Sequence, residues 1–240
     1  MHLIKVKSIL KKLLNLLLNK SNYELKKRYS NYNLETFLFN CRKNGLELKI
    51  IYDIGAYKGE WARYISQLLG GQFKIFMFEP NTAHNEYLLR TKFSFFNILL
   101  SDKVKKVNFY RKNLTGDSYF KELGKYYTDI DPIEITSTTL DLAAHDLKLP
   151  LPDLIKIDTQ GSELDILKGG LRAMTNAKII ILEIPIVKYN SGAPNFDDYI
   201  DFLNRYDFLP AYLIEVHFID KCIVQIDLAF MPKHLISDFV

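Results

Sequence analysis

The chain has 240 residues, 48% apolar and 25% charged, a composition typical of a soluble globular protein that excludes disorder over most of its length. The length suits one large α/β domain with a substantial core. The net charge of +4 combines +7 from residues 1–30 with −3 from the rest, which disfavours a nucleic-acid-binding body. Cys41 and Cys222 stand far apart without metal-ligand spacing, which favours a reducing, cytoplasmic setting.

The first part of the chain predicts a basic amphipathic helix. Between Leu3 and Leu18 apolar residues recur at helical spacing, with lysines and asparagines on the other face. The segment is too charged to span a bilayer and has no signal-peptide cleavage site. We expect its apolar face to pack on the domain or on a second subunit, as a homodimer; peripheral membrane contact through residues 3–18 is the alternative. Residues 1–33 are thus predicted as an extension, and residues 34–240 as the domain.

The predicted domain opens with a helix over 34–44, followed by the stretch KIIYDIGAYKGEW from Lys49 to Trp61. A short apolar run leads to Asp53 and to two glycines, Gly55 and Gly59, and a helix is predicted over 60–69. This is a strand, a tight turn and a helix start, where glycine allows positive φ and close approach of a ligand. The spacing DxGxxxG differs from the GxGxxG of dinucleotide-binding folds. It resembles the first motif of S-adenosylmethionine-dependent methyltransferases, and we expect Gly55, Ala56, Tyr57 and Gly59 to contact that cofactor.

A second buried strand is predicted over 73–78 and ends in Glu79-Pro80. Doubly wound nucleotide-binding folds place a carboxylate at this strand end to accept hydrogen bonds from ribose hydroxyls. The alternative is a surface Glu79 that caps the next helix together with Asn81.

The following elements continue the alternation of a parallel sheet. A helix is expected over 82–91, a third strand over 95–100 that ends in Ser101-Asp102, a short strand over 107–111, a strand over 133–140 and a helix over 141–147. The polar, Tyr-rich segment from Asn113 to Asp131 is long for a compact domain and predicts a binding loop.

A second informative stretch is DLIKIDTQGSELDIL, from Asp153 to Leu167. It predicts a strand over 154–157 that ends at Asp158, a turn at Gly161 and a helix from Ser162. A fifth strand over 178–183 ends at Glu183. Because ligands bind off the carboxyl ends of parallel strands, we expect one rim to collect these acids: Asp53, Glu79, Asp102, Asp158 and Glu183. A helix over 196–206 and a closing antiparallel hairpin, residues 208–218 and 222–231, complete the domain.

Taken together, these motifs resemble the FkbM-type methyltransferases from about Leu34 to Met231. The resemblance rests on YDIGAYKGEW, FEPN, LSD, TLD, LIKIDTQGSELDIL, LEI and QIDLAF. It implies a class I Rossmann-like α/β fold, a mostly parallel doubly wound sheet with a C-terminal antiparallel hairpin. It also implies S-adenosylmethionine as methyl donor and a hydroxyl on a sugar or natural product as acceptor. Many family members carry Glu where this chain has Gln160, so that position is not treated as an obligatory base.

Methyl transfer needs alignment and, for an alcohol, a proton acceptor. Asp158 is the first candidate, with helix capping as its alternative role, and Lys156, Glu163 and His217 complete the candidate catalytic set. The predicted cofactor set consists of Asp53, Gly55, Ala56, Tyr57, Gly59, Glu79, Pro80, Ser101, Asp102 and Asp158. No HxxxH or CxxC set is present, so a metal could bind only through rim carboxylates, and none is predicted.

Three other functions compete with O-methylation. A nicotinamide-dependent oxidoreductase would need GxGxxG and an all-parallel sheet. Methylation of nitrogen in bases usually comes with an Asn/Asp-Pro-Pro-aromatic turn where this chain has Asp158 to Gly161. The non-enzyme alternative is a membrane-surface or scaffolding protein that retains a nucleotide-binding fold, and the basic helix is its support. We expect a small-molecule or glycan acceptor, which would make polysaccharide modification the setting, in the cytoplasm and with possible membrane association.

Overall fold

The computed structural model describes residues 33–111, 117–120, 131–187 and 192–236. The chain divides into two units, residues 1–31 and 32–240, and the second unit is the one described here. The predicted amphipathic helix over 3–18 therefore lies outside the described residues. The elements, in chain order, are α2 Leu34–Lys43, β1 Ile50–Ile54, α3 Glu60–Leu68, β2 Lys74–Phe78, η2 Thr82–His84, α4 Asn85–Leu89, β3 Ser94–Phe96, β4 Lys105–Phe109, β5 Ile133–Ser137, α5 Leu140–Asp146, β6 Leu154–Ile157, α6 Glu163–Lys168, α7 Leu171–Asn176, β7 Ile179–Pro185, α8 Phe196–Asn204, β8 Phe208–Ile219, β9 Cys222–Pro232 and α9 Lys233–Ile236.

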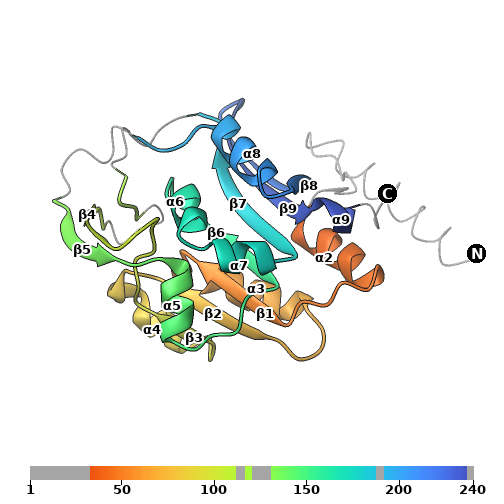
Figure 1. Cartoon of the computed structure of the whole chain (residues 1–240), viewed down its shortest axis with the longest axis horizontal. Helices are drawn as coiled ribbons and strands as arrows, with labels where there is room; N and C mark the ends of the chain where they lie inside the picture. The colour runs from red at the N-terminus through yellow and green to blue at the C-terminus, as the bar shows by residue number, and fades with distance from the viewer. Residues whose placement is uncertain (1–32, 112–116, 121–130, 188–191, 237–240) are drawn as a thin grey trace, which may run out of the picture. The chain divides into compact units, whose positions relative to one another are not determined.

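One seven-stranded sheet forms the centre, in the order β3-β2-β1-β6-β7-β9-β8 (Figure 1). Strands β3, β2, β1, β6 and β7 are parallel, and the hairpin of β8 and β9 adds antiparallel strands beside β7. The order reverses between β1 and β6, and this reversal is the point where open α/β sheets bind ligands. The α/β fold with a mostly parallel sheet and a C-terminal hairpin is therefore confirmed.

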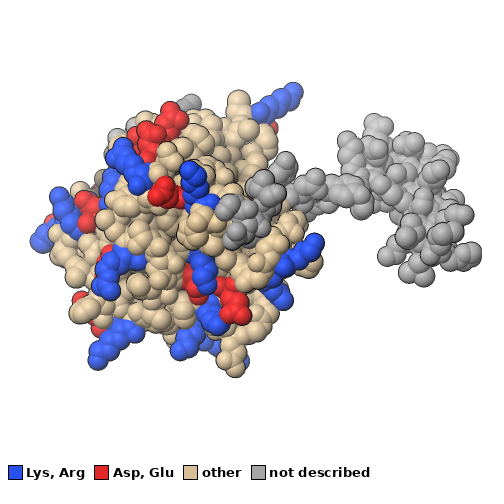
Figure 2. Space-filling view, turned by 45° about the vertical axis from the view of Figure 1, so that its right-hand side comes forward, with Lys and Arg blue, Asp and Glu red and all other residues tan. Residues whose placement is uncertain are grey.

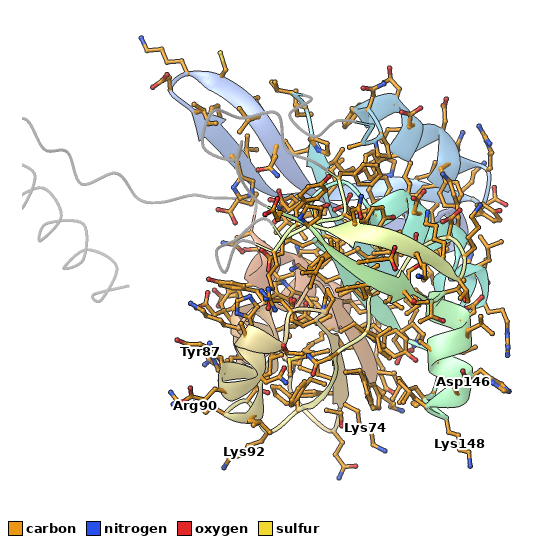
Figure 3. The ribbon with its side chains drawn as sticks, turned by 90° about the vertical axis from the view of Figure 1, so that its left-hand side faces the viewer. Lys74, Tyr87, Arg90, Lys92, Asp146 and Lys148 are labelled. Carbon is orange, nitrogen blue, oxygen red and sulfur yellow. The ribbon has the colours of Figure 1, made fainter. Side chains whose placement is uncertain are left out.

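Two apolar layers enclose the sheet. Side chains alternate along each strand, so Tyr52 and Ile54 face the core beneath α5 to α8, whereas Ile51 faces the core beneath α2, α3 and α4. At the N-terminal ends of the strands the surface is charged. Lys74 at the start of β2, with Lys92 and Lys148, points outward there (Figure 3). On the face shown in Figure 2, Lys and Arg side chains are interspersed with Asp and Glu.

Several predicted elements differ from the structure in length. The third strand was expected to reach Leu100, but β3 ends at Phe96, because Asn97 donates to the Glu79 carbonyl oxygen at 2.9 Å and the chain then bridges from Leu100 to Thr138. The helix expected over 82–91 is a 3₁₀ turn followed by the short α4. Strands β4 and β5 pair with each other in a separate two-stranded sheet.

The helix after β6 is interrupted at Gly169-Gly170, which the sequence analysis did not predict. A Cβ at Gly169 would lie 2.2 Å from the Ser101 carbonyl oxygen, so the close approach of that loop requires glycine there. The helix therefore ends and restarts as α7. Among the residues described, none of the helices has the length and apolarity needed to cross a bilayer.

Candidate active site

A cavity of about 420 Å³ lies at the carboxyl ends of the central parallel strands. Pockets of this size hold small molecules and cofactors. Seven of the predicted site residues line it: Gly55, Ala56, Tyr57, Glu79, Pro80, Lys156 and Asp158. The remaining predicted residues, Asp53, Gly59, Ser101, Asp102, Glu163 and His217, are not among its lining residues.

Glu79 is held in one orientation at the end of β2. Its Oε2 accepts from the Tyr57 backbone N–H and its Oε1 from the Asn81 backbone N–H, both at 2.8 Å. The side chain is buried, and burial raises its pKa to about 7 although both backbone donors act to lower it. Each oxygen keeps a second lone pair, so the carboxylate can accept from a ligand hydroxyl. Asn81 was considered above as a residue that caps the next helix together with Glu79. It is the N-cap of η2 through its own side chain.

The glycines of the β1–α3 loop serve packing as well as ligand approach. At Gly55, where φ is +76°, a Cβ would lie 1.9 Å from the Asp158 carbonyl oxygen, so glycine lets the loops after β1 and β6 touch. At Gly59 the space is taken by the Thr91 side chain. The N–H groups of Gly55 and Ala56 donate to the Phe78 carbonyl oxygen. The loop therefore forms a wall of the cavity, while its first amides hold it to β2.

Three charged side chains, Lys156, Asp158 and Asp53, lie close together where β1 and β6 meet the cavity. Lys156 Nζ lies 2.9 Å from Asp158 Oδ2 and 3.8 Å from Asp53 Oδ1. Asp53 is fully buried, and burial raises its pKa to about 6 against the attraction of Lys156. Asp53 pairs with Lys156 across β1 and β6 and shares a face of the sheet with it, so Asp53 helps to hold Lys156 at the cavity, and its contact with the cofactor stays a prediction.

Asp158 and Glu183 form a carboxyl pair at the ends of β6 and β7. Burial would raise the pKa of Asp158, but Lys156 and the hydrogen bond with Glu183 lower it to about 2. Burial, and then the charge of Asp158, raises the pKa of Glu183. Gln160 Nε2 donates to Asp158 Oδ1 at 3.2 Å and to Glu183 Oε2. Asp158 is therefore the charged member of the pair and a weak base.

Glu163 is a structural carboxylate. It is fully buried and accepts from the N–H groups of Thr159 and Gly161, at 2.9 and 3.0 Å, and from the Tyr199 hydroxyl at 2.7 Å. These bonds close the turn between β6 and α6. The prediction that Glu163 belongs to the catalytic set does not fit this position, since its oxygens point into the protein.

Ser101 and Asp102 bind protein groups beside the cavity. Asp102 Oδ1 accepts from Lys105 Nζ at 2.6 Å, and Ser101 Oγ lies 3.2 Å from the Tyr119 hydroxyl. They were predicted to contact the cofactor because β3 was expected to reach Leu100. Leu99 and Leu100 line the cavity in their place.

His217 lies on β8 beside Asp227 of β9. Its Nε2 is 3.4 Å from Asp227 Oδ1, and Asp227 raises the pKa of the imidazole while burial opposes that. Together with Glu183 these residues form a cluster whose candidate ligand atoms all lie within 4.8 Å of one another. We call it the Glu183–His217–Asp227 cluster.

Residues 53–210 match the family model described as the methyltransferase FkbM domain, which is more than half of the chain. The chain belongs to the FkbM methyltransferase family. The resemblance inferred from the motifs is thus confirmed, and the family assigns methyltransferase activity to this chain.

Relatives of this FkbM family member are distant. The 2-O-methyltransferase NoeI of Sinorhizobium fredii is 23% identical over 181 residues, covering 68% of this chain and 74% of that protein. The crystal structure of a methyltransferase FkbM from Methylobacillus flagellatus KT is 20% identical, with a TM-score of 0.47. The match covers 76% of this chain and only 43% of the Methylobacillus chain. A putative O-methyltransferase from Klebsiella pneumoniae is 13% identical, with a TM-score of 0.47, over 92% of this chain and 89% of that one.

The FkbM family motifs do not point to every lining residue. The segment after β4 contributes Asp117, Ser118 and Tyr119, of which Ser118 Oγ donates to the Gln160 carbonyl oxygen at 3.0 Å. These residues fall in the predicted binding loop 113–131, the rest of which lies mostly outside the described residues. Trp61 and Gln225, which do fall within the motifs YDIGAYKGEW and QIDLAF, also line the cavity, although neither was predicted as a site residue. Gln225 could have been found from the hairpin register, which places it opposite His217.

Proposed function

We propose that the protein is an S-adenosylmethionine-dependent O-methyltransferase that acts on a hydroxyl of a sugar, glycan or related small molecule. The observation that carries the proposal is the composition of the cavity: it holds the oriented carboxylate of Glu79 over β2 and a polar group of Asp158, Gln160 and Glu183 over β6 and β7. One part suits a cofactor and the other suits an acceptor.

The residues present fit the methyl donor. Glu79 offers acceptor lone pairs to ribose hydroxyls, and the side chains of Ile98, Leu99 and Leu100 offer an apolar surface to an adenine ring. When bound, S-adenosylmethionine supplies a methyl group on a positively charged sulfur. Carboxylates around the cavity favour a cation, since an opposite charge at short range is stabilised in a site of low dielectric.

Asp158 is the proton acceptor we propose for the acceptor hydroxyl. Its pKa of about 2 makes it a weak base toward a free alcohol. The alcohol becomes strongly acidic as its oxygen gains a new bond to carbon, so an ionised carboxylate can take the proton late in the step. A weak base contributes at the low end of the usual range for proton transfer, about 10²-fold.

The polar side chains that line the cavity over β6 and β7 also support a sugar-like acceptor. Carboxylates and amides such as Glu183, Gln160 and Gln225 accept and donate hydrogen bonds to neighbouring hydroxyls. The turn after β6 reads Asp158-Thr159-Gln160-Gly161 and differs from the turn of nitrogen methyltransferases. The printed name of NoeI, a 2-O-methyltransferase, agrees with an oxygen acceptor.

The test incubates the full chain with S-adenosylmethionine and a panel of monosaccharides, sugar nucleotides and oligosaccharides. Release of S-adenosylhomocysteine and gain of one methyl group in an acceptor are expected. Asp158→Asn should slow transfer about 10²-fold with donor affinity retained. The matched control is Asp146→Asn, an exposed carboxylate at the far end of the domain (Figure 3). Failure to bind the donor would refute the proposal, and unchanged turnover in Asp158→Asn would refute the role of that residue.

A further inference from the structure

The Glu183–His217–Asp227 cluster is built by three adjacent strands. Glu183 on β7 stands directly opposite Asp227 on β9 in the antiparallel ladder. His217 on β8 stands opposite Gln225, two residues before Asp227. Directly paired residues, and residues two apart on one strand, share a face of the sheet. The three side chains therefore converge because of strand register.

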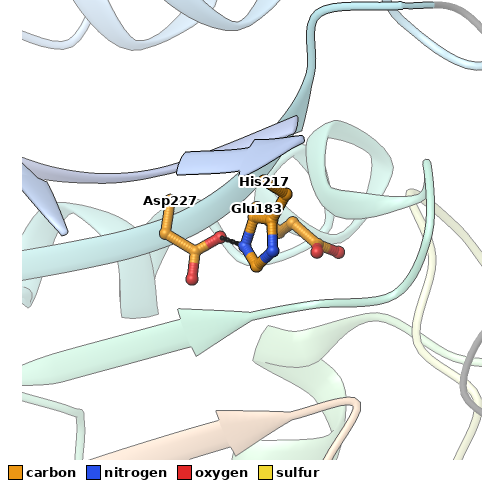
Figure 4. Close-up of side chains that lie close together, drawn as sticks. All are labelled: Glu183, His217 and Asp227. Atoms are coloured by element: carbon orange, nitrogen blue, oxygen red, sulfur yellow. Dashed lines mark ion pairs between the residues drawn. The ribbon is translucent and has the colours of Figure 1, made fainter. Parts of the chain in front are cut away.

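The atoms of the cluster are spaced like ligands of one ion. His217 Nε2 and Asp227 Oδ1 face each other at 3.4 Å (Figure 4). Both atoms are buried, yet neither meets the geometry of a hydrogen bond with any partner in the described chain. Two ligand atoms about 2.1 Å from a common ion lie about 3.0 to 3.4 Å apart. The pair thus has the separation of shared ligands, and it is longer than the usual N–H···O distance of about 2.9 Å.

The third ligand connects the cluster to the cavity. Candidate atoms of all three residues lie within 4.8 Å of one another, so a small side-chain rotation brings them onto one ion. Glu183 lines the cavity, and Gln160 Nε2 donates to its Oε2, as an outer partner that orients a ligating carboxylate does.

We propose that Glu183, His217 and Asp227 bind a divalent cation. One imidazole and two carboxylates suit first-row transition ions such as Mn²⁺ better than ions that prefer thiolates or all-oxygen shells. Three protein ligands leave positions open on the side of the cavity. The role, which rests on the proposed function, is to hold two neighbouring hydroxyls of the acceptor and to lower the pKa of the one that is methylated. Its proton would pass to the Asp158 carboxylate, and the O–H electron pair would stay on the oxygen that forms the new bond to the methyl carbon. The carbon–sulfur bond would break, and its electron pair would leave with sulfur as S-adenosylhomocysteine.

Binding of Mn²⁺ alone to the metal-depleted full chain tests the site without any methyl transfer. Electron paramagnetic resonance should show one bound Mn²⁺ per chain, and spin-echo modulation should show a coupled ¹⁴N nucleus. Asp227→Asn should weaken Mn²⁺ binding at least about tenfold, and His217→Gln should remove the ¹⁴N coupling. Asp220→Asn, which removes one carboxylate from the exposed tip of the same hairpin, should leave Mn²⁺ affinity unchanged. Retained donor binding in each variant shows that the domain is folded.

The outcomes separate this site from the proposed activity. Failure of Mn²⁺ to bind up to millimolar concentrations, or equal affinity in wild type and Asp227→Asn, overturns the metal site and leaves methyl transfer standing. Stoichiometric Mn²⁺ binding in a chain that binds no donor would support the site and refute the proposed function. Full methyl transfer in the metal-depleted chain would overturn the role of the ion in holding the acceptor.

Discussion

Replacing Glu79 with Gln tests the cofactor site at its most buried carboxylate. The amide nitrogen must take the place of one oxygen, so either the Tyr57 or the Asn81 N–H faces a donor in place of an acceptor. The ligand hydroxyls also lose a charged acceptor. Hydrogen bonds to charged groups contribute about 1.5–3 kcal/mol, which corresponds to about 10- to 150-fold weaker binding of S-adenosylmethionine.

Isothermal titration calorimetry measures this loss directly. Glu86→Gln, an exposed carboxylate on α4 that pairs with Arg90, is the matched control and should bind as the wild type does. Equal affinity in Glu79→Gln and wild type would refute the reasoning, because it would mean that the carboxylate does not face the donor.

The same residue predicts a pH dependence of donor binding. Its pKa is about 7 in the free protein, and the ionised form accepts the ligand hydroxyls. Affinity should therefore rise with pH up to about 7 and level off above, with a slope near tenfold per pH unit below pH 7. Glu79→Gln should lack this slope, and any residual slope in it reports titration of the ligand. A wild-type affinity that stays constant from pH 5 to 8 would contradict the assignment.

Three further variants test the surroundings of the site. Gly55→Ala places a Cβ 1.9 Å from a carbonyl oxygen and should lower the denaturation midpoint far more than Gly71→Ala does. Gly71 also has a positive φ, but a Cβ there would meet nothing within 4 Å. Equal shifts in the two variants would refute the packing argument. The pKa of Asp53, about 6, lies above its unfolded value, so the free energy of unfolding should fall by about 2 kcal/mol as pH rises from 4 to 6. Thermal denaturation of Asp53→Asn should show a smaller fall over the same range. Tyr199→Phe removes a hydrogen bond to Glu163 and should cost about 1–3 kcal/mol in urea unfolding while calorimetry shows unchanged donor affinity; a change in affinity alone would place Glu163 in the cavity after all.

The sequence was sufficient for the strands of the central sheet, taken along the chain, and for the family. Continuous apolar runs such as IIY before Asp53 mark strands that are buried on both faces, and each is followed by a turn and a helix. Such local patterns survive tertiary packing, because covering both faces of a parallel sheet requires them. Glu79 and Asp158 could be placed at the cavity for the same reason, since each directly follows such a strand.

The sequence did not predict where each strand ends or which way its side chains point. Asp53 was expected at the rim and Glu163 in the catalytic set, but neither lines the cavity: Asp53 is fully buried, and Glu163 turns inward to the amides of its own loop. Alternation along a strand fixes which residues share a face, but which face bears the cavity is decided by the packing of helices on it. Asp102 was misplaced because a long-range contact of Leu100 with Thr138 ends β3 early.

The Glu183–His217–Asp227 cluster shows where sequence reasoning stops. Glu183 was recognised as a strand-end acid and His217 was kept as a candidate, but α8 lies between their strands along the chain, and no motif links them. Only the pairing of β7 with β9 and of β9 with β8 brings them within 4.8 Å of each other and of Asp227. The sequence determined the elements and their carboxylates, whereas strand register, a property of long-range hydrogen bonding, decided which of those side chains meet.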